Sequence, residues 1–137
     1  MTRKPVPEFP VVLVDDEESI LSSTTRVLRA AGFDNIATCQ DPRDALELIE
    51  DRGAEVVLLD LAMPHLTGEE LLARIQEQHP EVPVIIVTAS GDIDTAVRCT
   101  KEGAFDYMVK AVEPARLVSG VRRAIEMRSL SRRYTAL

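Results

Sequence analysis

Four short apolar runs that each lead directly into a polar residue constrain the fold more than any other feature of this sequence. The runs cover residues 11–14, 56–59, 84–87 and 107–109. They are rich in β-branched residues and nearly free of polar ones, which is typical of strands in a parallel sheet with helices on both faces. A weaker run at 36–39 supplies a fifth strand. We therefore expect strands that are buried on both faces.

Helix signals follow the strand signals throughout the chain. The expected helices are about 19–31, one from Asp41-Pro42 to just before Gly53, one from the capping box Thr67-Gly68-Glu69-Glu70 to before Pro80, 93–102, and one that begins at Glu113-Pro114. At 137 residues the chain is long enough for one domain with a single core. This alternation predicts an α/β fold: a five-stranded, parallel, doubly wound sheet with five helices, of the flavodoxin-like type.

Reactive side chains stand at the ends of four predicted strands: Asp15 and Asp16, Asp60, Thr88 and Lys110. In an open parallel sheet the carboxyl ends of the strands meet at one edge, where ligands bind. Three crowded carboxylates repel one another by about 1–4 kcal/mol per close pair, so such a cluster needs a cation. Oxygen-only ligands favour Mg²⁺, with Mn²⁺ as an alternative.

This arrangement predicts phosphoryl transfer. Asp15 and Asp16 are expected to hold the metal, while Asp60 contacts it and serves as the nucleophile that becomes an aspartyl phosphate. Thr88 and Lys110 are expected to stabilise the phosphoryl oxygens. Without phosphate, Lys110 is expected to pair with Asp60.

The motifs around these residues resemble a receiver domain of two-component response regulators, over about residues 11–125. The matching segments are Val14-Asp15-Asp16-Glu17, Leu58-Leu59-Asp60-Leu61-Ala62-Met63-Pro64 with Thr67-Gly68 after it, Val87-Thr88-Ala89-Ser90, and the stretch from Gly103 through Tyr107 to Lys110. The resemblance implies a sensor histidine kinase as phosphodonor and Mg²⁺ as the required ion. It also implies that the Ala62 carbonyl is a metal ligand, that Thr88 and Tyr107 form a switch pair, and that the domain is a signalling switch rather than an enzyme.

A narrower resemblance concerns the segment 91–97 and the Gly-Ala-Phe-Asp-Tyr segment at 103–107. Together they are similar to the N-terminal receivers of NtrC-type, sigma-54-dependent transcription regulators. This similarity implies an output in transcription regulation. The alternative is a stand-alone receiver that transfers phosphate or binds a protein without a DNA-binding partner domain.

The chain is expected to divide into an N-terminal tail (1–10), a receiver domain (11–126) and a C-terminal helical extension or start of a linker (127–137). In the last part Met127, Leu130, Tyr134 and Leu137 continue the helical spacing among several arginines. This pattern fits either a fraying basic end or the first turns of a coiled coil. A homodimer is expected through this helix, or through the face made by the fourth helix, fifth strand and fifth helix.

One position departs from the family pattern. Receivers usually have proline after the lysine, whereas Ala111 follows Lys110 here. A cis bond before a residue other than proline costs roughly 3–4 kcal/mol, so we predict a trans Lys110–Ala111 bond.

Composition and charge exclude other classes. A net charge of −7 argues against direct nucleic-acid binding by this chain. No apolar run approaches the roughly 20 residues of a membrane span, and the start lacks the pattern of a signal peptide, so we expect a cytoplasmic protein without membrane contact. Cys39 and Cys99 are expected to be core residues rather than a disulfide.

Three alternatives remain open from the residues. A flavodoxin-like cofactor binder needs a phosphate-binding loop after the first strand, where this chain has four acidic residues (15–18). A phosphatase with an aspartate nucleophile would carry D-x-D at that position. The third alternative is a degenerate receiver that only binds partners, and the complete set of site residues argues against it.

Overall fold

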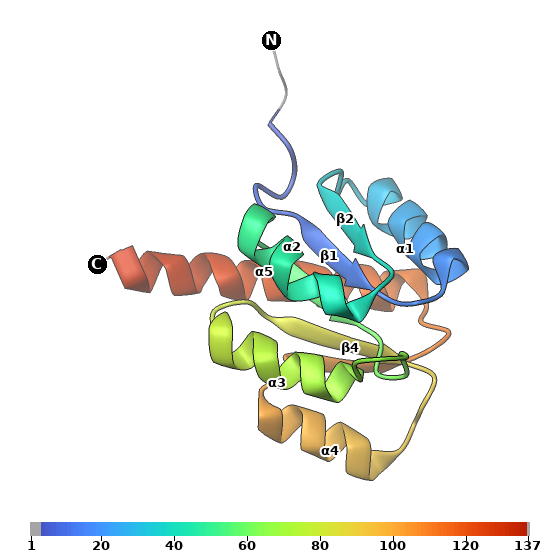
Figure 1. Ribbon diagram of the computed structural model, residues 1–137. Coiled ribbons are helices and arrows are strands. Elements are labelled where there is room, and N and C mark those ends of the chain that lie inside the picture. The colour runs from blue at the N-terminus through green and yellow to red at the C-terminus, as the bar shows by residue number, and fades with distance from the viewer. Residues whose placement is uncertain (1–3, 137) are drawn as a thin grey trace.

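Five parallel strands form one sheet in the computed structural model, which describes residues 4–136 (Figure 1). In chain order the elements are β1 (Val11–Val14), α1 (Glu18–Ala30), β2 (Ile36–Cys39), the 3₁₀ turn η1 (Pro42–Asp44), α2 (Ala45–Arg52), β3 (Val56–Leu59), α3 (Gly68–Gln78), β4 (Val84–Thr88), α4 (Ile93–Glu102), β5 (Asp106–Val109) and α5 (Pro114–Ala136). The strand order is β2-β1-β3-β4-β5. The predicted fold class is confirmed, and the strands and most helices lie within a residue or two of their expected bounds. The helix expected from Asp41-Pro42 differs more, because the 3₁₀ turn η1 comes first and α2 begins only at Ala45.

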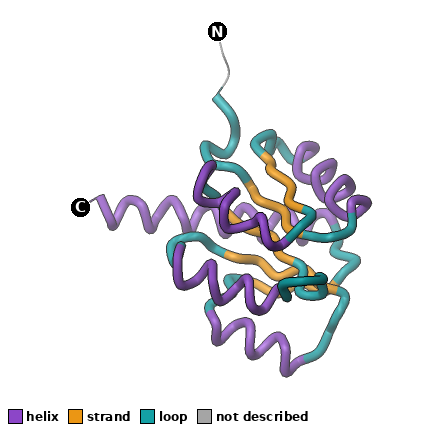
Figure 2. Tube along the Cα trace, in the orientation of Figure 1, coloured by secondary structure: helices purple, strands orange, loops and turns teal. Residues whose placement is uncertain are grey.

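Helices cover both faces of the sheet, so the domain has three layers (Figure 2). Alternate residues of each central strand face opposite layers: Val12 and Val14 pack with α2, α3 and α4, whereas Val11 and Leu13 pack with α1 and α5. The alternation follows from the two-residue period of a strand. Since both faces are apolar, the sheet is fixed between two cores.

The expectation that the four strong apolar runs form strands buried on both faces is wrong for the last of them. β5 is an edge strand next to β4 alone, and Val109 is 46% exposed. A short apolar run does not distinguish an edge strand from a central one, because this difference depends on the order of strands in the sheet. β1 and β3, at the centre, are fully buried as predicted.

Polar caps fix the start of two helices that lead away from the functional edge of the sheet. Thr67 Oγ1 accepts a hydrogen bond from the backbone N–H of Glu70 at 3.2 Å, and Asp92 Oδ1 accepts one from Asp94 at 3.2 Å. Such caps satisfy N–H groups that the first helical turn leaves free. The capping box at Thr67 was predicted from the sequence, and it is confirmed.

The C-terminal helix extends as one continuous element to Ala136 and is held against the opposite end of the sheet from the acidic residues. Arg132 donates two hydrogen bonds, of 3.1 and 3.0 Å, to the carboxylate of Glu55 at the start of β3. Its guanidinium also lies 5.0 Å from the centre of the Phe9 ring. The helix is therefore anchored well beyond residue 126; Leu137 and the side chains from Tyr134 onward lie outside the described residues.

Arg132→Ala is expected to lower the free energy of unfolding by about 1–3 kcal/mol. Glu55 is only 3% exposed, so the substitution leaves a buried carboxylate without its partner. The expected loss is below the range for fully buried pairs because the Arg132 side chain is itself 36% exposed. Urea denaturation measures the change, and the exposed neighbour Arg133→Ala is the matched control, with a change of at most ~0.5 kcal/mol. Equal effects of the two variants would contradict the anchoring role.

Two further sequence-based expectations concern the core and the membrane. Cys39 and Cys99 are both buried free thiols, as predicted. Among the described residues, no helix combines the length and the apolar character that a membrane span requires.

Candidate functional site

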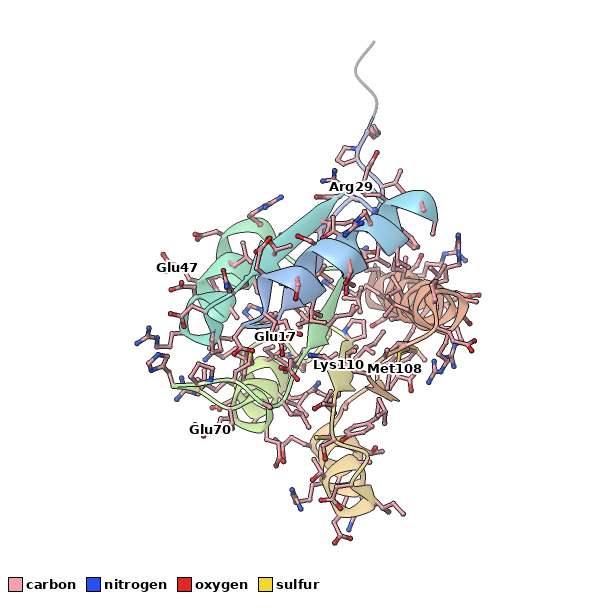
Figure 3. The ribbon with its side chains drawn as sticks, turned by 90° about the vertical axis from the view of Figure 1, so that its right-hand side faces the viewer. Glu17, Arg29, Glu47, Glu70, Met108 and Lys110 are labelled. Atoms are coloured by element: carbon pink, nitrogen blue, oxygen red, sulfur yellow. The ribbon has the colours of Figure 1, made fainter. Side chains whose placement is uncertain are left out.

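The sheet topology brings the predicted site residues to one edge. β1 and β3 are paired in register, with Val14 opposite Leu59, so Asp15 and Asp60 follow directly from neighbouring strand ends. Thr88 is the last residue of β4, and Lys110 follows β5. Figure 3 shows Lys110 near Glu17, at the start of α1, and next to the strand ends.

Three carboxylates form a cluster at this edge. Asp15, Asp16 and Asp60 each offer an oxygen, and these oxygens lie within 4.8 Å of one another. Asp15 and Asp60 are 5% and 4% exposed, whereas Asp16 is half-buried. Buried carboxylates this close repel one another unless a cation or a proton is present. The all-oxygen donor set with one accessible member fits a hard divalent cation.

The ammonium group of Lys110 crosses to the cluster from the far edge of the sheet. Its Nζ donates a hydrogen bond to Asp15 Oδ2 at 2.8 Å and lies 3.7 Å from Asp60 Oδ2. The pairing with Asp60 expected from the sequence is therefore present at the longer distance, and Asp15 is the closer partner. Burial alone would lower the pKa of Lys110, but the hydrogen bond to Asp15 and the attraction of both carboxylates outweigh burial and raise it.

The negative charge of Asp60 is only partly neutralised by its neighbours. Burial raises the pKa of its carboxyl group, and the negative charge of Asp15 raises it further, against the smaller lowering effect of Lys110. One ammonium group thus faces three carboxylates. The site therefore has a negative electrostatic potential that a divalent cation would neutralise.

Thr88 and Tyr107 are linked to the same loop after β4. Thr88 is buried, at 1% exposure, and its hydroxyl oxygen is 3.5 Å from the backbone N of Ser90, which donates to it. The hydroxyl of Tyr107 donates a hydrogen bond to the carbonyl oxygen of Ser90 at 2.8 Å. The two side chains predicted as a pair therefore hold one segment, the turn that leads to α4.

The predicted trans Lys110–Ala111 bond is wrong, because this peptide bond is cis. The prediction used the intrinsic preference of an isolated peptide bond. In the folded chain, contacts with two other strands fix Lys110: its N–H donates to the carbonyl of Thr88 at 2.7 Å, and its Nζ bonds to Asp15. Such contacts can outweigh a local backbone preference.

Gly68 was not predicted to have a role at the site, although it belongs to the Thr67-Gly68 part of the receiver motif. The N–H of Gly68 donates to the carbonyl of Leu61 at 3.0 Å. A Cβ atom at Gly68 would collide with the Asp60 carbonyl oxygen and would lie 2.5 Å from Leu61 Cα. This contact needs the absence of a side chain, so Gly68 holds the loop after Asp60 close to α3. The spacing between Asp60 and a glycine after a capping threonine was the only available signal.

Gly68→Ala is expected to lower the free energy of unfolding by about 1–3 kcal/mol, because the methyl group meets backbone atoms that cannot rotate away. Gly91→Ala is the matched control, since its nearest neighbour would be a side-chain atom of Val109 at 4.0 Å. Chemical denaturation of both variants measures the difference. If Gly68→Ala is as stable as Gly91→Ala, the close approach to Asp60 does not matter.

Three comparisons with known proteins agree with this architecture. The sequence profile of the response regulator receiver domain matches residues 11–122. The DNA-binding transcriptional regulator NtrC of Escherichia coli is 39% identical over 115 residues, which are 84% of this chain and 24% of NtrC. The luminescence regulatory protein LuxO of Vibrio campbellii is 37% identical over 113 residues, 82% of this chain and 25% of LuxO. The chain thus spans about a quarter of the length of these relatives.

Among solved structures, the receiver domain of NtrX from Brucella abortus superimposes with a TM-score of 0.80 at 36% identity, covering 85% of this chain and 98% of that one. A longer NtrX structure with ADP gives a TM-score of 0.85 at 34% identity and covers 93% of this chain and 29% of the other. Fold, sequence profile and relatives coincide over nearly the whole chain. The chain therefore belongs to the family of response regulator receiver domains.

Proposed function

We propose that this chain accepts a phosphoryl group on Asp60 from a sensor histidine kinase and changes conformation as a result. Receiver domains are phosphorylated by histidine kinases as a family. The observation that carries the proposal is the buried Asp60 carboxylate with Asp15, Asp16 and Lys110 around it. The domain then acts as a signalling switch, and the only reactions that it catalyses are its own phosphorylation and dephosphorylation.

The chemistry assigned to Asp60 is an in-line displacement at phosphorus. One carboxylate oxygen forms a bond to phosphorus while the bond from phosphorus to the donor nitrogen breaks, and the electron pair stays on the imidazole. Negative charge on the phosphoryl oxygens is stabilised by the ammonium group of Lys110, 3.7 Å from Asp60, and by the hydroxyl of Thr88. Both groups come from strand ends at the same edge of the sheet as Asp60.

Asp15, Asp16 and Asp60 fit a divalent cation, and we assign Mg²⁺ to them together with the carbonyl of Ala62; Mn²⁺ is the alternative. When bound, the ion neutralises the carboxylates and the incoming phosphoryl group. Asp16 and Ala62 lie on the open side of the site, half-buried and exposed respectively. The Asp15 side chain is oriented by a hydrogen bond that its Oδ1 accepts from the backbone N–H of Glu17 at 3.0 Å.

The switch in this proposal is the pair Thr88 and Tyr107. If Thr88 turns toward a phosphoryl group on Asp60, the turn at Ser90 moves with it, because the Ser90 N–H donates to the Thr88 hydroxyl. The Ser90 carbonyl also accepts the hydrogen bond from the Tyr107 hydroxyl. Tyr107 then moves from its position beside α4 to one behind Thr88. This movement is a population shift between two conformations that already exist. The face formed by α4, β5 and α5 changes with it.

The proposed output is transcription regulation, because the relatives NtrC and LuxO are named as regulators. The parts are a tail (1–10), the receiver (11–126) and a helical extension or linker start (127–137). A stand-alone receiver is the second candidate. We assign the protein to the cytoplasm, where such regulators reach DNA, and expect neither direct nucleic-acid binding nor membrane contact.

A homodimer is proposed through the α4–β5–α5 face or the C-terminal helix. Ile93, Val97 and Val109 are exposed on the first surface, and Met127 and Leu130 on the second. Exposed apolar side chains in neighbouring turns are typical of protein contacts.

Intact-mass spectrometry after incubation with acetyl phosphate tests the proposed function. We expect one added phosphoryl group in the presence of Mg²⁺ and none when the ion is removed by a chelator. The phosphodonor replaces the kinase, so the result does not depend on knowing the cognate partner. Wild-type protein that gains no mass with Mg²⁺ would instead favour a degenerate receiver that binds partners without being phosphorylated.

A further inference from the structure

A cavity of about 270 Å³ lies between α1 and α5, beside the strand ends that carry the acidic residues. Its walls are apolar and come from the strands, both helices and the segment after Lys110: Leu13, Leu58, Ile20, Val27, Val112 and Leu117. Exposed Ser23 and Ala111 also line it, so the cavity reaches the surface between α1 and the start of α5. In Figure 3, Lys110 lies beside the strand ends, below α1 in this view.

One end of the cavity is polar and carries a net negative charge. Asp15, Asp60 and Lys110 line this end, so that two carboxylates face one ammonium group. Lys110 is nearer to Asp15 (2.8 Å) than to Asp60 (3.7 Å). The Asp60 carboxylate is therefore the less neutralised of the two, and a second cationic donor at this end would be attracted rather than repelled.

The size of the cavity sets the size of an occupant. A dry cavity of about 150 Å³ binds benzene in another protein, so 270 Å³ leaves room for one aromatic ring and a short chain. Ligand sites of this kind combine apolar walls with a few polar groups that fix the orientation. Here the polar groups are at one end only.

We propose that this cavity binds a small arylalkylammonium compound, with the ring between α1 and α5 and the ammonium group at Asp60. The ring packs against Leu13, Val27 and Leu117, and the charged end completes the neutralisation of the two carboxylates. Binding does not rest on the proposed phosphorylation function, since it needs neither a metal nor a phosphoryl group, although both involve Asp15 and Asp60. An occupant would lie directly beside the phosphoacceptor.

The test is a titration of methyl-labelled, metal-free protein with 2-phenylethylammonium, followed by NMR. We expect saturable shifts of the Leu13, Val27 and Leu117 methyl signals. Neutral 2-phenylethanol should bind more weakly, and the anion phenylacetate at least tenfold more weakly than the ammonium compound. Methylammonium, which has the charge without the ring, should leave these methyl signals unmoved.

Two threonines of α1 provide a matched pair of variants. Thr24 lines the cavity, whereas its neighbour Thr25 is not part of the lining and donates its hydroxyl to the Leu21 carbonyl. Both are half-buried. Thr24→Phe should fill the cavity and weaken binding at least tenfold, while Thr25→Phe should stay within twofold of wild type. Should Thr24→Phe fail to fold, the exposed pair Ser23→Phe, at the cavity mouth, and Ser22→Phe, outside it, replaces the first pair.

Three results would overturn the proposal. The first is the absence of saturable methyl shifts with 2-phenylethylammonium. The second is equal binding of phenylacetate, which would show that the charge at Asp60 does not select the ligand. The third is a set of methyl shifts equal in size with methylammonium and 2-phenylethylammonium, which would reduce the effect to a cation at the acidic cluster.

Discussion

Asp60→Asn is expected to abolish phosphorylation and, at the same time, to make the metal-free domain more stable at neutral pH. The amide cannot act as the nucleophile, so the added mass expected with acetyl phosphate and Mg²⁺ should disappear. The gain in stability arises because a neutral amide replaces a carboxylate that is 4% exposed and close to two others. Removing such repulsion is worth about 1–2 kcal/mol at an intermediate effective dielectric constant.

The sign of the pH dependence follows from the pKa of Asp60. Burial and the charge of Asp15 raise this pKa above the ordinary value of 3.8. A carboxyl group with a raised pKa in the folded state weakens folding as the pH rises through that pKa, and it has no such effect below the unfolded value. Asp60→Asn should therefore match wild type near pH 3.5, gain stability over it as the pH rises from 3.8 through the raised pKa, and keep the full difference at neutral pH.

Thermal or urea denaturation at several pH values measures this difference, with Mg²⁺ removed. Asp51→Asn, an exposed position on α2, is the matched control and should keep both phosphorylation and wild-type stability. A phosphoryl adduct on the Asp60→Asn protein would show that another residue is the phosphoacceptor. Lower stability of this variant at neutral pH would mean that the attraction of Lys110 outweighs burial and repulsion at Asp60.

Most of the fold follows from local patterns. The runs at 11–14 and 56–59 are apolar on both faces, which is unusual outside the centre of a parallel sheet, and both form central strands. Capping residues such as Thr67 and Asp92 satisfy backbone groups within a few residues, so the sequence predicts where α3 and α4 begin. Such features depend on neighbours in the chain.

What could not be predicted depends on residues far apart in the chain. Lys110 was expected to pair with Asp60, but its Nζ lies closer to Asp15, at 2.8 Å, than to Asp60, at 3.7 Å. The partly buried ion pair of Arg132 with Glu55 joins residues 77 positions apart. Neither pairing has a sequence signal, since many charged residues could serve as partners before the chain is folded.

Lys110→Met is expected to reduce phosphoryl transfer from acetyl phosphate by about 10²–10³-fold, the usual cost of removing one preorganised charge donor. Methionine keeps the length and the apolar part of the side chain but loses the ammonium group. Lys101→Met, at an exposed position on α4, is the matched control and should transfer at the wild-type rate. Single-turnover rates under saturating Mg²⁺ measure the effect. A Lys110→Met rate within threefold of wild type would remove Lys110 from the reaction.

The same variant should lose stability in the absence of metal, because Lys110 is the counter-ion that Asp15 and Asp60 contact. Removing one partner of a buried ion pair costs about 3–5 kcal/mol, and partial exposure of this side chain, at 17%, places the expected loss near 2–4 kcal/mol. The pKa of Asp60 would then be still higher in the folded state, because Lys110 no longer lowers it. The loss should therefore be small near pH 4 and full at pH 7–8.

Mg²⁺ separates the two contributions of Lys110. A cation at the carboxylates replaces the missing positive charge, so Mg²⁺ should stabilise Lys110→Met more than wild type and restore most of its lost stability. It should not restore the transfer rate, because an ion held by the carboxylates leaves the far side of the phosphoryl group without its donor. If Mg²⁺ restores rate and stability together, Lys110 serves only as a counter-ion in the unliganded site. If it restores the stability alone, Lys110 also stabilises the transferring group.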